Sequence, residues 1–190
     1  MGWQHFLGGA KTGASGTKPG VKPGTDAADT ETVRRIVAQL EAMPHDRARF
    51  LAAFAYILTR AAAADLDISA AEAHEIEVLV MEHASLPEAQ AVLVAQMARH
   101  QALLYGATED YLVTRQFKDL STEAERLDLL RCCYLVSAAD DEISLQESDT
   151  LQDIALELDV DRNAVKAMRE EFAPKLSTIK ALRRLRAEED

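Results

Sequence analysis

Apolar residues recur at intervals of three and four from Glu31 onward, and this spacing constrains the fold more than any other feature. The first stripe consists of Val33, Ile36, Val37 and Leu40. This is the pattern of a helix that buries one face. After Pro44, a nearly all-apolar second helix is predicted over residues 50–64. No run alternates polar with apolar, β-branched residues as a half-buried strand would. The sequence therefore predicts an all-α domain.

Several predicted helices begin with a capping box. In this motif the side-chain oxygen of Ser or Thr accepts from the backbone N–H three residues on, and a Glu at that position accepts from the N–H of the first residue. The predicted pairs are Ser69 with Glu72, Ser85 with Glu88, Thr122 with Glu125, and Ser144 with Glu147. Asp161 is the predicted N-cap of a later helix.

The chain contains an internal repeat. Residues 63–72 align with residues 138–147, and the apolar helix that precedes them, 50–64, aligns with residues 125–139. A unit of about four helices is thus predicted twice, at about 32–105 and about 107–173. Two long copies are too few for a solenoid. We expect a duplicated four-helix unit that forms one pseudo-twofold bundle with a shared core.

The two ends of the chain differ from this helical part. Seven of the eight glycines lie between Gly2 and Gly24, so residues 1–29 are predicted to be a flexible Gly/Lys-rich tail. The aromatic segment at Trp3 is a candidate anchor within it. Residues 174–190 are predicted to form a basic amphipathic helix. That helix either docks on the acidic bundle or binds a membrane surface or a partner.

Charge and cysteine content exclude some classes of function. Lys and Arg total 21 against 32 Asp and Glu, a net charge of −11, which disfavours nucleic-acid binding. The cysteines, Cys132 and Cys133, are adjacent and lie in an apolar run, so they predict core packing and a reducing compartment rather than a disulfide framework. No spanning segment or secretory signal is evident. The expected location is the cytoplasm.

Each repeat joins its apolar helix to the next through an acidic turn. The candidate ligands for a divalent cation are Asp65, Asp67 and Glu72 in the first turn, and Asp140, Glu142 and Glu147 in the second. Neither turn is an EF-hand, because position 6 is Ala70 or Leu145 instead of glycine and position 12 is not acidic. Two interpretations stay open. The acids cap helices, or the two turns converge and pool their carboxylates around an ion.

The pattern Ala-Asp-x-x-Ile-Ser-x-x-Glu, present twice in an acidic all-α chain, resembles the TerB-like family of bacterial tellurite-resistance and stress proteins. The resemblance covers about residues 30–173. The family pattern, close to A-D-G-x-I-x-x-x-E, places its Asp at Asp65 and Asp140 and its Glu at Glu72 and Glu147. The family glycine is replaced by Leu66 in one copy and by Asp141 in the other.

The resemblance implies a cytoplasmic, non-enzymatic binding or scaffold protein of the tellurite or chemical stress response. It implies divalent-cation binding at the acidic residues, protein partners, and contact with complexes at the inner membrane. The family also supplies the N-terminal domain of a membrane-bound DnaJ-type co-chaperone. The residues predict no catalytic group and no certain cofactor; a divalent cation is the one candidate. Two alternatives are a carboxylate-metal hydrolase at the same acids and a membrane-peripheral, partner-binding module.

Overall fold

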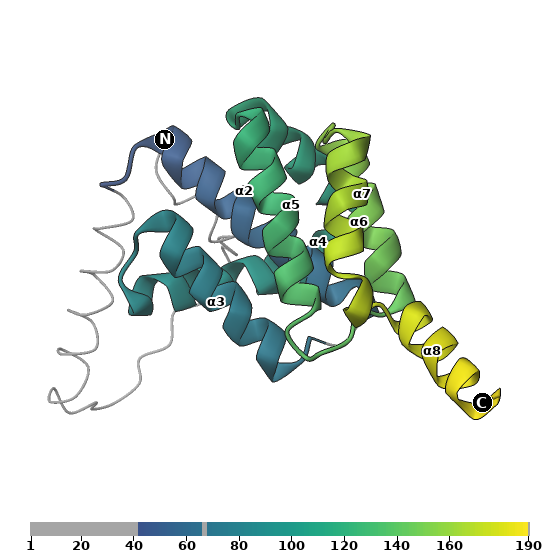
Figure 1. The fold of residues 1–190 in the computed structure, drawn as a ribbon. Helices are drawn as coiled ribbons and strands as arrows, with labels where there is room; N and C mark the ends of the chain where they lie inside the picture. Colours follow the sequence, from purple (N-terminus) through teal and green to yellow (C-terminus); the bar gives the residue numbers. More distant parts are fainter. Residues whose placement is uncertain (1–41, 66–67, 190) are drawn as a thin grey trace, which may run out of the picture. The chain divides into compact units, whose positions relative to one another are not determined.

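The computed structural model describes residues 42–65 and 68–189 (Figure 1). Within these ranges the chain is helical and contains no strand, which confirms the all-α prediction. Residues from Arg49 onward form one compact unit. The predicted tail at 1–29, its Trp3 segment and the predicted helix around Val33–Leu40 lie outside the described residues.

The helices follow one another with short connections. The elements are α2 (His45–Ala62), the 3-10 turn η2 (Ala63–Asp65), α3 (Ala70–Ala84), α4 (Glu88–Leu120), α5 (Glu123–Ser137), α6 (Leu145–Glu157), α7 (Arg162–Glu171), the 3-10 turn η3 (Ala173–Lys175) and α8 (Ser177–Glu189). Helix α3 packs against both α4 and α5, and α6 packs against α4, α5 and η2. The α3–α5 contact places α3 beside the second half of the chain (Figure 1).

The two apolar helices of the predicted repeat, α2 and α5, supply the centre of the core. From Leu51 to Ala62, α2 buries all but two of its residues, and α5 buries seven residues between Leu129 and Ser137. Aromatic rings connect α2 to α4, with the ring centroids of Phe50 and Phe117 4.8 Å apart. Helix α2 is therefore covered on most sides over its apolar run, and α5 is covered over its second half. The pseudo-twofold relation between the repeats stays a prediction.

Helix α4 runs through Gly106 without interruption. The sequence predicts the boundary between the two repeat units at this glycine, but there the chain continues a single helix of 33 residues. One glycine inside a helix costs only about 1 kcal/mol relative to alanine. The packing of α4 against α3 and α6 offsets such a cost. The two predicted repeat units are therefore joined by a shared helix.

Most predicted helix starts are confirmed. The capping boxes at Ser69, Thr122 and Ser144 are all formed, and Asp161 caps α7 by accepting from two backbone N–H groups. The box predicted at Ser85 is wrong. Ser85 has a φ of 53° and closes α3 as its C-cap, donating its N–H back to that helix, while Pro87 is the N-cap of α4. Proline presets the φ of a first turn without a side-chain cap.

The C-terminal segment docks beside the second acidic turn. Ile143 and Leu176 form an isolated bridge, in which Ile143 N–H donates to the Lys175 carbonyl and Ser177 N–H to the Ile143 carbonyl, both at 2.9 Å. This pairing fixes where α8 begins. None of the described helices combines the length and the apolar content needed to cross a bilayer.

A buried ion-pair network connects three helices of the core. Arg60 of α2 donates from both terminal nitrogens to the carboxylate of Glu157 on α6, at 2.6 and 3.1 Å, and also donates to Thr114 of α4. Asp110 of α4 lies 3.5 Å from the guanidinium and accepts a hydrogen bond from the hydroxyl of Tyr56. Arg60 is only 12% exposed, so its charge depends on these partners.

Candidate functional site

The two motif glutamates are held by the backbone of their own helix starts. Glu72 accepts from Ser69 N–H at 2.7 Å while its own N–H donates to Ser69 Oγ at 3.1 Å. Glu147 and Ser144 repeat this arrangement at 2.8 and 3.1 Å. In each case only Oε2 of the glutamate serves the cap. Capping therefore fixes each carboxylate but leaves its second oxygen for another contact.

The same two carboxyl groups bring the two acidic turns together. The carboxyl groups of Glu72 and Glu147 are close enough that each affects the pKa of the other, although the residues come from different predicted repeats. Both side chains are buried, with 4% and 3% of their surface exposed. Two buried carboxylates repel each other unless a proton or a cation lies between them. This pair is thus the place in the described structure where the predicted site residues converge.

The electrostatics around Glu72 and Glu147 favour a proton or a metal ion between the two carboxyl groups. Burial raises the pKa of Glu147 to about 7, and the neighbouring charge of Glu72 adds to the increase. Burial likewise raises the pKa of Glu72, and the charge of Asp140 contributes. Oε1 of Glu147 is fully buried and accepts no hydrogen bond from any residue that the structure describes. A proton or a metal ion would satisfy this oxygen, and carboxylate oxygens are the ligands that hard divalent cations prefer.

The remaining acids of the second turn are exposed and partly engaged by α8. Asp140 Oδ1 accepts from the N–H of Glu142 at 3.1 Å. Lys180 Nζ lies 3.3 Å from the Glu142 carboxylate and also donates to the carbonyl of Asp141, and Lys175 pairs with the Asp141 side chain. This lysine pair holds the pKa of Asp141 below its usual range. Lysines of the predicted basic helix therefore neutralise part of the turn.

The position of the family glycine keeps a glycine-like backbone. Asp141 has a φ of 78°, in the left-handed region that glycine enters without cost and aspartate tolerates better than most residues. The sequence difference at this position therefore does not remove the turn conformation. The equivalent residue of the first turn, Leu66, lies outside the described residues.

The first turn is described only in part. Asp65 ends η2 and is exposed, whereas the predicted ligand Asp67 lies outside the described residues. Because η2 packs against α6, Asp65 is on the segment that faces the second repeat. Of the six predicted ligands, Glu72 and Glu147 affect each other's pKa and Asp140 is close enough to affect Glu72. Glu142 is bound to Lys180 instead.

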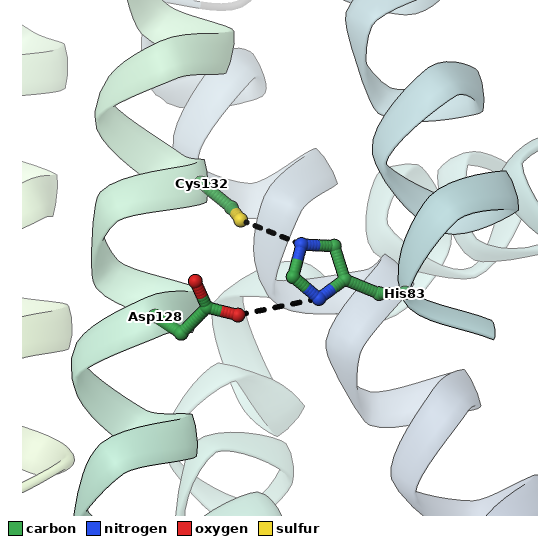
Figure 2. A group of neighbouring side chains, drawn as sticks. All are labelled: His83, Asp128 and Cys132. Carbon is green, nitrogen blue, oxygen red and sulfur yellow. Dashed lines mark hydrogen bonds and ion pairs between the residues drawn. The ribbon is translucent and has the colours of Figure 1, made fainter.

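A second group of polar side chains was missed by the sequence analysis. His83 of α3 lies against Asp128 and Cys132 of α5 (Figure 2). The sequence predicts core packing for Cys132. His83 does contact the ring of Phe54, at 5.0 Å between centroids, and Cys132 is buried. The four-residue spacing of Asp128 and Cys132 places them on one helix face, but nothing in the sequence indicates that His83 faces them.

The fold and the paired acidic turns define a class of protein: an all-helical domain in which two acidic turns each lead into a capped helix and contribute a buried glutamate to a common point. The chain belongs to the TerB family, because the family model described as tellurite resistance protein TerB matches residues 50–170. This match confirms the resemblance seen in the sequence. No curated protein and no solved structure matches the chain.

Proposed function

We propose that the chain is a non-enzymatic binding protein of the tellurite or chemical stress response, and that its two acidic turns bind a divalent cation. The proximity of the buried carboxyls of Glu72 and Glu147, which affect each other's pKa, carries this proposal. A hard cation such as Mg²⁺, Ca²⁺ or Mn²⁺ would replace the shared proton, satisfy Glu147 Oε1, and take the exposed Asp140 as a further ligand. Asp65 and Asp67 would complete the set from the first turn.

The same pair supports a binding role over catalysis. Both glutamates are already held by the caps of α3 and α6, so a bound ion would connect the starts of two helices. Such a closed, helix-linking site suits a conformational or partner-binding role, whereas a metallohydrolase requires an open coordination position beside substrate. Protein partners are the expected ligands of the remaining surface.

Calorimetric titration of the full chain with Mg²⁺, Ca²⁺ and Mn²⁺ tests the cation site. We expect saturable binding by the wild type and its loss in the Glu72→Gln/Glu147→Gln variant, because glutamine retains the cap but not the charge. Glu125→Gln is the matched control, since Glu125 serves the third capping box but is exposed. Absence of heat and of any shift in melting temperature with all three ions would reduce the acids to helix caps. Hydrolysis of a phosphodiester by the metal-loaded wild type alone would favour the hydrolase alternative.

Exposed leucines on α8 favour a second candidate, a peripheral module at the inner-membrane surface. Leu182 and Leu185 are 62% and 60% exposed on a helix that is also basic, the composition of a surface-binding amphipathic helix. We expect the full chain to float with anionic vesicles and the Leu182→Ser/Leu185→Ser variant to float much less. Equal recovery of both proteins in the unbound fraction would exclude this role for α8.

A further inference from the structure

Three side chains with different metal-binding chemistry meet away from the acidic turns. Nδ1 of His83 lies 3.2 Å from the carboxylate of Asp128, and its Nε2 lies 3.4 Å from Sγ of Cys132. Figure 2 shows the imidazole, from α3, held between the carboxylate and the thiol, which both project from α5. One donor atom from each residue can be chosen so that all three lie within 4.8 Å of one another.

A tetrahedral zinc site is somewhat tighter than this group. Bonds of about 2.0–2.3 Å to N, O and S place neighbouring ligand atoms about 3.3–3.6 Å apart, whereas one donor atom from each of the three residues lies within 4.8 Å of the others. Binding therefore requires one nitrogen of His83 to turn toward both partners. The imidazole is 29% and the carboxylate 51% exposed, so both can rotate toward a common point. Cys132 is the fixed ligand, since it is only 2% exposed. An ion could reach the group from the solvent side, where the imidazole and the carboxylate are exposed.

The charges around Cys132 favour metal binding over nucleophilic catalysis by its thiol. Burial raises the pKa of its thiol to about 12, and Asp128, Glu75 and Glu82 add to the increase, with Arg131 acting against it. A nucleophilic cysteine needs cationic surroundings that lower its pKa. Here three carboxylates create a negative potential at the sulfur, which disfavours a free thiolate and attracts a cation.

We propose that His83, Asp128 and Cys132 form a second metal site, which takes a thiophilic divalent ion such as Zn²⁺. Binding replaces the Cys132 proton with the metal ion and releases that proton to solvent. The ion joins α3 to α5, and so connects the first predicted repeat to the second. This site combines sulfur, nitrogen and oxygen donors and therefore selects a different class of metal from the all-carboxylate turns.

Titration of the reduced full-length protein with Co²⁺, followed by competition with Zn²⁺, tests the site. A cobalt–thiolate bond gives a charge-transfer absorption in the near ultraviolet, which no carboxylate site produces. We expect the wild type to develop this band and Zn²⁺ to abolish it while raising the melting temperature. Cys132→Ser should remove the band. Asp128→Asn should keep it but weaken apparent Co²⁺ affinity by roughly 10–100-fold.

Cys133→Ser is the matched control, because Cys133 is adjacent and equally buried but is not part of the group. It should retain the band, as should Glu72→Gln/Glu147→Gln, so this result is independent of the acidic turns. Circular dichroism verifies that each variant is helical; if Cys132→Ser is unfolded, His83→Gln decides in its place. A wild type without the band, or a band that survives both Cys132→Ser and His83→Gln, would overturn the proposal.

Discussion

Replacing Arg60 by methionine should lower the free energy of unfolding by about 3 kcal/mol, the lower end of the cost of breaking a buried ion pair. Methionine retains the apolar stem of the side chain, so the loss reports mainly on charge. The substitution would leave Glu157 and Asp110 without the cation that they share. The side chains of these two acids are 18% and 30% exposed. Urea denaturation followed by circular dichroism measures the change.

Arg131→Met provides the matched comparison for Arg60→Met. Arg131 forms the same two-bond contact with Glu171, at 2.7 and 2.6 Å, but both side chains are about half exposed. Exposed pairs contribute little because water screens them. We therefore expect only a small change for Arg131→Met. Equal losses in the two variants would mean that burial is not what makes the Arg60 network important.

Replacing Glu147 by glutamine should raise stability at pH 8 and leave it nearly unchanged at pH 5. In the folded wild type the pKa of Glu147 is raised from 4.5 to about 7, so the folded state holds a proton that the unfolded state releases. Stability is therefore fully present below about pH 4.5 and decreases as pH rises through about 7. The shift from 4.5 to about 7 is about 2.5 units, so at about 1.4 kcal/mol per pKa unit the wild type and the variant differ at pH 8 by roughly 3–4 kcal/mol.

The measurement is a series of denaturant titrations between pH 5 and pH 8 in the presence of EDTA, which excludes effects of bound cations. Glutamine resembles the protonated acid: it accepts from the Ser144 N–H in the cap and donates toward Glu72. Glu125→Gln should retain the wild-type pH dependence, because Glu125 caps an exposed helix start. If wild-type stability instead increases with pH and Glu147→Gln follows it, the two carboxyls do not share a proton.

Local features of the fold were predictable where a few neighbouring residues determine them. The caps at Ser69 and Ser144 depend on hydrogen bonds within four residues, and the burial of α2 and α5 depends on uninterrupted apolar runs. Ser85 shows the limit of this approach. Ser85 and Glu88 match the capping-box motif, but the left-handed backbone at the end of α3 makes Ser85 a C-cap. Pro87 is the N-cap of α4 instead.

The candidate sites were less predictable because they depend on packing between distant segments. The sequence identified Glu72 and Glu147 as candidate ligands, but their proximity requires the starts of α3 and α6 to meet. The His83 group requires the end of α3 to pack against α5 at one register. Apolar spacing specifies which face of a helix is buried, but it does not specify which helix covers that face.

Helix α4 connects the folding of the two predicted repeat units. At 1.5 Å per residue its 33 residues extend about 50 Å, and its side chains contribute to the Arg60 network and to the aromatic core. A chain cut at Gly106 would leave each fragment with half of this helix and without its packing partners. The predicted repeat units are thus not separable modules: the chain should unfold in a single cooperative transition, and neither half should accumulate as a stable intermediate.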